Sequence, residues 1–289
     1  MDPFLAEYPE TQWVDMKYNA GFARANNEGM RRAKGETILL LNPDTILPPG
    51  ALENCFYPFV QSEYIACGVQ LLNEDGSPQI SGNYFIRGGL NYLLPLPYLG
   101  KFIQKTAKAF SLKTPHVAET RSLTEVDWIN GAFLMVKKSA IQKAGMMDED
   151  FFLYAEEAEW CARLKKTGKL CIYGSVNIFH LQGITSNEAF SSKGKGYYNL
   201  FDRKGYQIIL SNLVRIRKQY GIFWFLFILF VYTVDIPIFF IGLMISILYP
   251  ISRRTYHFTQ WRGFSIHVLK VWSKVFIILG NRPYFYKVL

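Results

Sequence analysis

The sequence predicts an α/β fold, with a mainly parallel sheet flanked by helices and apolar helices at the C-terminal end. Short apolar runs bounded by turn residues alternate with helical segments, which is typical of a parallel sheet. The last third of the chain contains thirty residues with a single charge. Half of the 289 residues are hydrophobic, which excludes a disordered chain. The four cysteines are isolated, so a zinc or disulfide scaffold is not expected and a reducing compartment is favoured.

Each element is predicted from its local pattern. The run at 36–41 (ETILLL) is continuously apolar and compact, as in a strand that is buried on both faces. Gly35 is a suitable C-terminal cap for the helix before it, and Pro48, Pro49 and Gly50 suit the start of the helix after it. Residues 85–120 contain Gly and Pro pairs and are expected to be irregular. The expected helices are 22–33, 51–61 and 155–166, and the expected strands are 11–16, 36–41, 65–72, 126–136 and 170–178.

The apolar segment at 222–251 has Asp235 and Pro237 near its middle and basic flanks. Its length as one helix would be ~45 Å, longer than a ~30 Å hydrocarbon core. A single span would also place one basic flank outside the cell. We therefore expect a bent helical hairpin that enters one leaflet with both ends cytoplasmic. The alternative is a buried pair of helices in a soluble domain.

The net charge of +9 is concentrated in the same region. From Arg203 to the C-terminus there are twelve lysines and arginines, and Asp235 is the one acidic residue. Basic residues around an apolar segment favour an anionic membrane surface. Nucleic acid is the competing partner, but no nucleic-acid-binding motif accompanies these residues, so none is expected.

The first candidate site is Asn42-Pro43-Asp44, directly after the predicted strand at 36–41. Ligands of open α/β sheets bind beyond the carboxyl ends of strands, where a carboxylate can hold a divalent cation. Alternatively, Asp44 caps a turn. His180 follows the last predicted strand and would join Asp44 as a metal ligand if the two converge; otherwise it is a structural histidine.

The second candidate is an acidic cluster at 148–159. On a helix, Glu157 shares the inward face with Trp160 and Cys161, whereas Glu159 pairs with Arg163. A carboxylate directed inward at a helix start is a candidate general base. The alternative is an acidic first turn that complements the helix dipole.

The segment Trp128-Ile129-Asn130-Gly131-Ala132 is the third candidate. Gly131 would let the backbone approach a ligand closely, and Trp128 could stack on a sugar ring. The alternative is a core tryptophan beside a strand bulge.

Taken together, these segments resemble family 2 glycosyltransferases of the GT-A fold, in particular the bacterial rhamnosyltransferase-like branch. The resemblance covers residues 1–190 and is carried by motifs in the family's order. They are Asn19-Ala20-Gly21-Phe22-Ala23 with Asn26-Asn27-Glu28-Gly29, Leu41 to Thr45, Asn130 to Val136, Gly145 to Glu157, and His180.

The resemblance implies inverting transfer of a hexosyl or deoxyhexosyl group from a nucleotide-sugar donor to a lipid-linked or polysaccharide acceptor. Asn42-Pro43-Asp44 takes the place of the family's DxD motif, so Asp44, with His180, would ligate Mg²⁺ or Mn²⁺. Glu156-Glu157 matches the family's Glu-Asp pair, with Glu157 as the catalytic base. The other residues expected to bind donor or acceptor are Asn26, Asn42, Trp128, Asn130, Gly131 and Glu156.

We expect two regions. Residues 1–200 would form the glycosyltransferase domain, and residues 201–289 a basic, apolar helical region at the cytoplasmic face of the bacterial inner membrane. The family normally begins with a nucleotide-binding strand–helix–strand unit, and the first region is expected to lack it. Two rival readings are a catalytically inactive remnant that binds sugars or nucleotides, and a membrane scaffold.

Overall fold

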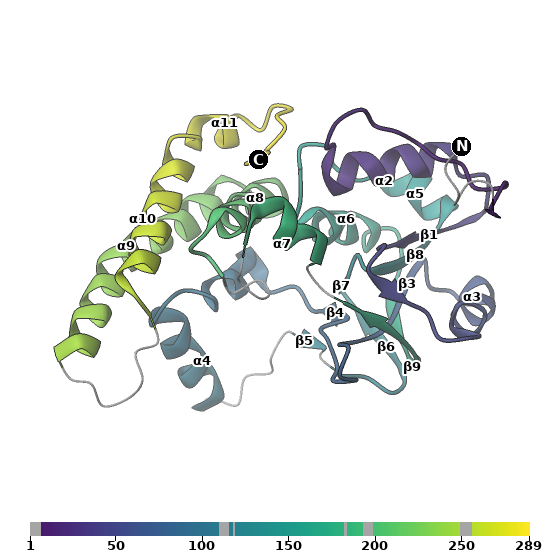
Figure 1. Cartoon of the computed structure of the whole chain (residues 1–289), viewed down its shortest axis with the longest axis horizontal. Coiled ribbons are helices and arrows are strands. Elements are labelled where there is room, and N and C mark those ends of the chain that lie inside the picture. Colours follow the sequence, from purple (N-terminus) through teal and green to yellow (C-terminus); the bar gives the residue numbers. More distant parts are fainter. Residues whose placement is uncertain (1–6, 110–115, 118, 182–183, 193–198, 249–255) are drawn as a thin grey trace.

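The computed structural model describes residues 7–109, 116–117, 119–181, 184–192, 199–248 and 256–289. The sheet occupies one side of the molecule and helices α8–α11, together with α4, occupy the other (Figure 1). The main sheet has the order β1-β8-β3-β9-β2, and β6 pairs with β9 outside this path. Its strands are β1 (Thr37–Leu41), β2 (Thr45–Ile46), β3 (Ala66–Leu72), β6 (Leu123–Val126), β8 (Phe133–Lys137) and β9 (Leu170–His180).

The α/β class is confirmed, but the sheet is mixed, so the expectation of a mainly parallel sheet was wrong. β3 and β9 are parallel, whereas β8 lies between β1 and β3 and is antiparallel to both. Strand β8 is antiparallel to β1 because its first residue, Phe133, pairs with Leu41, the last residue of β1. Strands β1, β3 and β9 therefore run in one direction, and their carboxyl ends meet at one edge of the sheet.

A small second sheet, in the order β5-β4-β7, explains one inaccurate expectation. Its strands are β4 (Gly82–Asn83), β5 (His116–Val117) and β7 (Trp128–Ile129). The single strand expected at 126–136 is divided between the two sheets: β7 belongs to the small one and β8 to the large one. Asn130 and Gly131 form the turn between them, which places this turn at the edge where β1 ends.

Three helices next to the main sheet begin and end close to the expected positions: α2 (Gly21–Arg32), α3 (Ala51–Gln61) and α6 (Glu156–Leu164). A further helix, α5 (Lys138–Ala144), was not expected from the sequence. The strand expected at 11–16 was wrong, because this segment forms no regular element. The excursion at 85–120 is more regular than expected, since it includes the 3₁₀ segment η1 (Arg87–Leu93) and α4 (Leu99–Ala109).

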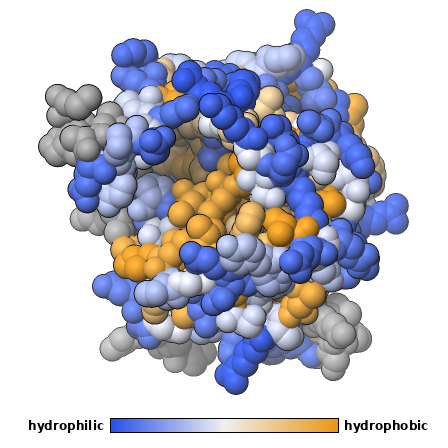
Figure 2. Space-filling model, turned by 90° about the vertical axis from the view of Figure 1, so that its right-hand side faces the viewer, coloured by the Kyte–Doolittle hydropathy of each residue, from blue (hydrophilic) through white to orange (hydrophobic). Residues whose placement is uncertain are grey.

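Among the described residues, β1 pairs with another strand on one side only. Figure 2 shows the end of the molecule that carries α2, α3 and β1, where apolar side chains gather beside a hollow on an otherwise largely hydrophilic face. Leu41, at the end of β1, is 42% exposed. An apolar edge strand is thus accessible at this end of the sheet.

The C-terminal helices form a second layer with its own hydrophobic core. They are α7 (Ile184–Phe190), α8 (Arg203–Tyr220), α9 (Ile222–Leu248), α10 (Phe258–Trp272) and α11 (Val275–Gly280). Their core also includes Leu93 and Leu96 near η1, and Phe151 and Phe152 before α6. The helical layer is therefore built from more than the last ninety residues, and it packs directly on the acidic segment that precedes α6.

The hairpin expected at 222–251 was wrong over the described residues, because Ile222–Leu248 is one continuous helix that contains Pro237. Proline removes one backbone hydrogen bond and commonly bends a helix. Here the residues on both sides of it, from Phe225 to Leu243, are buried in the same core, so packing keeps the two halves in one helix. This is the one described helix that is long and apolar enough to cross a membrane.

Candidate active site

A cleft of about 850 Å³ lies at the edge of the sheet where β1, β3 and β9 end. The segment after β1, the turn before β8, the end of β9 and the start of α6 all contribute to its wall. Of the predicted site residues, it is lined by Asn42, Asp44, Asn130, Gly131, Glu156, Glu157 and His180. The topology of the sheet brings these residues together, because the carboxyl ends of its three like-directed strands share this edge.

Asp44 and His180 meet at the junction of β2 and β9. Thr45 pairs with His180 in the sheet, and the Nε2 atom of His180 lies 3.4 Å from Oδ1 of Asp44. Both side chains are largely buried. Asp44 and His180 therefore converge, as the hypothesis that they bind one metal ion required.

Gln79 fixes the ring of His180. Its amide nitrogen donates to the backbone oxygen of His180 (2.6 Å) and to Oδ1 of Asn73 (2.8 Å), so its Oε1 is the atom that faces Nδ1 of His180, at 3.0 Å. An acceptor at this position keeps the proton on Nδ1 and directs the lone pair of Nε2 toward Asp44. Metal-binding histidines usually have such a partner on the other ring nitrogen.

The pair Asp44 and His180 fits a divalent cation that completes its coordination with phosphate and water oxygens. Among the described residues there is no cluster of three or more His, Cys, Asp or Glu side chains arranged to hold a metal ion. The donor set is thus suited to an ion that arrives with a diphosphate rather than to a closed structural site.

Glu156 and Glu157 begin α6 after two residues in the left-handed region. Tyr154 has φ 70° and Ala155 has φ 69°, a conformation that costs free energy in residues other than glycine. This sharp entry turns both carboxylates toward the cleft, where both are buried. Gly131 lies against them: a Cβ at Gly131 would be 3.6 Å from Cγ of Glu157.

The two carboxyl groups are electrostatically unequal. Burial, followed by the charge of Glu157, raises the pKa of Glu156 well above its usual value. Burial also raises the pKa of Glu157, but the positive charge of Arg215 opposes this increase. Of two adjacent buried carboxyls, Glu157 is therefore the one that ionises first.

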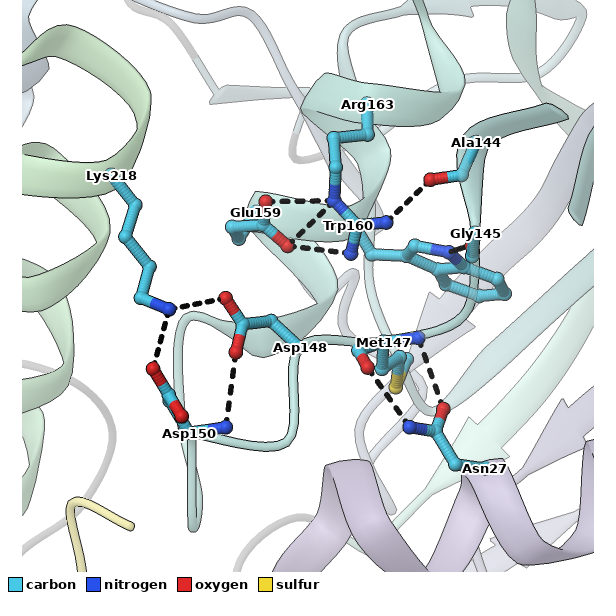
Figure 3. Close-up of polar contacts among 10 residues, drawn as sticks. All are labelled: Asn27, Ala144, Gly145, Met147, Asp148, Asp150, Glu159, Trp160, Arg163 and Lys218. Carbon is cyan, nitrogen blue, oxygen red and sulfur yellow. Dashed lines mark hydrogen bonds and ion pairs between the residues drawn. The ribbon is translucent and has the colours of Figure 1, made fainter. Parts of the chain in front are cut away.

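Figure 3 shows the contacts that hold the loop before α6. Nζ of Lys218 on α8 bonds to Asp148 at 2.5 Å and to Asp150 at 2.6 Å. Burial alone would lower the pKa of Lys218, but these two carboxylates outweigh it and raise the pKa. Asn27 on α2 bonds to the backbone of Met147 in both directions. The loop is therefore fixed by a helix from each layer.

Within α6, Glu159 pairs with Arg163 at 2.7 Å, as the i,i+4 spacing predicts. Arg163 also donates to the backbone oxygen of Ala144, and the indole of Trp160 donates to that of Gly145 (Figure 3). The acidic cluster thus has two groups: Asp148, Asp150 and Glu159 anchor the structure, whereas Glu156 and Glu157 face the cleft.

Two predicted binding residues lie elsewhere. Asn26 is on α2, where its side chain donates to the backbone oxygen of Phe22 one turn earlier, and it does not line the cleft. Trp128 is buried in the core beside the sheet and does not line the cleft either. The next residue, Asn27, has a structural role, because its side chain bonds to the backbone of Met147. Only these tertiary contacts distinguish the roles of Asn26 and Asn27.

Several cleft residues were not identified from the sequence. Asn73, Glu74 and Asp75 form the turn after β3, and Lys204 comes from α8. Lys204 donates to Oδ1 of Asn187 at 2.9 Å. The position of 73–75 directly after an apolar strand was a usable signal, whereas nothing local in the sequence indicates Gln79, Lys204 or Arg215.

Residues 2–129 match the sequence profile described as glycosyl transferase family 2. The expected resemblance to this family is thus confirmed over this segment.

The chain is 28% identical over 167 residues to a rhamnosyltransferase of Escherichia coli, an alignment that covers 55% of this chain and 59% of that protein. It is 25% identical over 192 residues to an N-acetylglucosaminyl-diphospho-decaprenol L-rhamnosyltransferase of Mycobacterium tuberculosis, covering 61% and 60%. It is 24% identical over 168 residues to a low-salt glycan biosynthesis hexosyltransferase of Haloferax volcanii, covering 55% and 48%. The chain therefore spans about half to three fifths of the length of these relatives.

Among solved structures, the chain is similar to a crystal structure of GalNAc-T7 with UDP, GalNAc and Mn²⁺. The TM-score is 0.43 at 13% identity, and the match covers 62% of this chain and 34% of that one. A likeness of this size carries no conclusion about ligands.

Proposed function

We propose that this protein is an inverting glycosyltransferase that moves a hexosyl or deoxyhexosyl group from a nucleotide-sugar to a lipid-linked or polysaccharide acceptor in cell-envelope glycan synthesis. The observation that carries the proposal is one cleft that contains both the Asp44–His180 pair and the Glu156–Glu157 pair. The family match and the glycan-synthesis relatives support the same class of reaction.

Asp44 and His180 would hold a divalent cation, Mg²⁺ or Mn²⁺, against the donor diphosphate. When bound, such an ion neutralises the charge that develops on the leaving diphosphate. Gln79 keeps Nε2 of His180 available for this role. Asn42 and Asn130 would bind the donor from the same wall.

Glu157 would act as the general base. It would take the proton of the acceptor hydroxyl while the hydroxyl oxygen attacks the anomeric carbon on the side opposite the leaving group. Its burial raises its pKa and makes it a stronger base than an exposed glutamate, and the charge of Arg215 favours its ionised form. Glu156, protonated beside it, would donate a hydrogen bond to the acceptor or the sugar. Gly131 lines the same cleft and would bind the donor or acceptor through its backbone.

We further propose that this activity is located at the cytoplasmic face of the inner membrane, and the proposed acceptor class and the apolar helix α9 support this location. A lipid-linked acceptor is confined to the bilayer, and its sugar hydroxyl must reach a cleft in an otherwise water-soluble fold. The mean hydropathy of 2.3 for α9 is consistent with contact with lipid.

The test is a transfer and binding assay on the 289-residue chain, with a panel of UDP-, GDP- and dTDP-sugars, a short polyprenyl-diphosphate-sugar acceptor, and Mn²⁺ or Mg²⁺. We expect metal-dependent glycosylation of the acceptor detected by mass spectrometry, with inversion at the anomeric carbon. Donor binding without transfer would favour the inactive remnant. Neither binding nor transfer across the panel would favour the scaffold and overturn the proposal.

A further inference from the structure

The exposed side of α9 is an apolar stripe that runs the whole length of the helix. Phe223, Phe230, Ile241 and Leu248 are each more than half exposed and recur at helical spacing on one face. The stripe is formed by Phe223, Leu226, Phe227, Phe230, Val234, Ile241, Ile245 and Leu248. Isolated exposed apolar residues are normal, but a continuous stripe of this length, ~40 Å at 1.5 Å per residue, marks an interaction surface.

The opposite side of α9 is packed on the protein along its length. Phe225, Leu229 and Phe239 are fully buried in the helical core, and α8 lies against α9. Helix α8 carries two buried charged residues, Lys204 and Arg215. A transmembrane orientation of α9 would therefore carry α8 and its charges into the hydrocarbon region, which is costly.

The two flanks of the stripe are also defined. On one flank α10 packs, with the indole of Trp272 donating to Thr233 and that of Trp261 donating to the backbone oxygen of Ile236. On the other flank lie η1 and α4, where Trp224 contacts Gly88 and Gly242 contacts Tyr98. Helices α10 and α4 thus both contact α9, and Figure 1 shows the three helices on the same side of the molecule.

Helix α4 contributes positive charge beside this surface. Lys101, Lys105 and Lys108 recur at i, i+4 and i+7 on its exposed side, and Phe102 next to them is 65% exposed. No ion pair involves these three lysines among the described residues. Unpaired lysines beside an apolar surface are complementary to anionic headgroups around acyl chains.

We propose that α9 lies in the plane of an anionic membrane surface, with its apolar stripe among the acyl chains and the lysines of α4 on the headgroups. The proposal deepens the membrane location proposed above, but its readout is lipid binding, so it can fail or succeed independently of sugar transfer. It assigns the membrane contact to one side of a folded layer instead of to a spanning segment.

The first test is co-sedimentation of the whole chain with vesicles of phosphatidylcholine, with and without phosphatidylglycerol. We expect tight binding only to the anionic vesicles. Charge reversal in K101E/K105E/K108E should weaken this binding by about a hundred-fold, and added salt should weaken the wild type similarly. The matched control K34E/K143E/K166E changes three exposed lysines elsewhere and should bind like the wild type. Equal loss in both triple variants would overturn the role of α4.

The second test concerns the stripe and its orientation. Phe230→Ser with Ile241→Ser should reduce vesicle binding at least ten-fold, whereas Tyr57→Ser with Val60→Ser on α3 should not.

The orientation of α9 is tested with the single variants Phe223→Cys and Leu248→Cys, one at each end of the helix. The four native cysteines are buried, so the introduced thiol is the accessible one. Both should react with a membrane-impermeant maleimide in solution, and both should become protected when anionic vesicles are added. Protection of one end only would show a spanning helix, and dimerisation in solution that the stripe variants abolish would show that a second copy covers the stripe; either result overturns the proposal.

Discussion

Nε2 of His180 lies 3.4 Å from Oδ1 of Asp44, although the two residues follow different strands and are far apart in the sequence. The contact exists because β2 and β9 are antiparallel and pair Thr45 with His180. The contact makes the Asp44 carboxylate and the His180 imidazole a single pair of possible metal ligands in the lining of the cleft.

Asp44→Ala should abolish metal-stimulated transfer, because the cation loses its only carboxylate at this position, while the fold is retained since Asp44 lies in a segment beyond a strand. Activity with Mn²⁺ and with EDTA, together with the melting temperature, measures this. Asp15→Ala, at an exposed position paired with Lys17, is the control and should behave like the wild type. Unchanged metal dependence in Asp44→Ala would contradict the ligand role.

Gln79→Leu removes the acceptor that holds the proton on Nδ1 of His180. We expect the apparent affinity for Mn²⁺ to fall ~10–100-fold with a smaller effect on donor affinity at saturating metal. Gln79→Glu keeps the acceptor and should retain more affinity than Gln79→Leu. The measurement is a Mn²⁺ titration of activity, and identical titration curves for Gln79→Leu and the wild type would contradict the orienting role.

Glu157→Gln preserves size and removes the base, so turnover should fall by ~10²-fold or more while donor binding changes little. Glu156→Gln should be milder, because burial and the charge of Glu157 raise the pKa of Glu156 and favour its neutral form. Steady-state kinetics and donor titration of both variants measure the difference. The reverse order of severity would assign the base to Glu156.

Arg215→Met should move the acidic limb of the pH–rate profile to higher pH. The charge of Arg215 lowers the pKa of Glu157, so its loss raises the pH at which the base becomes ionised. Arg215→Lys retains the charge and should restore much of the profile. Because Arg215 is buried and its Nη1 bonds to Tyr92, circular dichroism of each variant checks that it folds. A profile that loses height without shifting would indicate a purely structural role.

Asp235 is fully buried in α9, and neither carboxylate oxygen has a hydrogen-bond partner among the described residues. Burial raises its pKa to about 7. A raised carboxyl pKa makes the fold less stable as the pH rises from the unfolded value through about 7. Asp235→Asn should therefore increase the free energy of unfolding at pH 8, on the order of a few kcal/mol, and much less at acidic pH. Equal effects at both values would show that Asp235 is not ionised in the fold at pH 8.

The local sequence was sufficient for the elements whose pattern is self-contained. The run ETILLL predicts β1, and Ala51–Gln61 and the strand ending at His180 also follow from local apolar patterns and their bounding turn residues. Asp44, Gly131, Glu157 and His180 were identified because each follows, precedes or begins such an element, and ligand sites of α/β sheets lie at those positions. The family resemblance added Asn42, Asn130 and Glu156.

Tertiary structure decided what local pattern cannot express. The direction of β8 depends on which sheet its neighbour β7 joins, so the mixed sheet could not be read from alternating elements. The single helix α9 persists through Pro237 because both of its halves bury side chains in one core. Gln79 and Arg215 act on His180 and Glu157 through contacts between distant segments, and the unequal burial and charge at Glu156 and Glu157 exist only once α8 packs on α6. Sequence spacing specifies which face of a helix or strand a side chain occupies. Only the folded structure specifies which residues lie opposite that face. The pKa values and the geometry of the candidate ligands depend on those opposite residues.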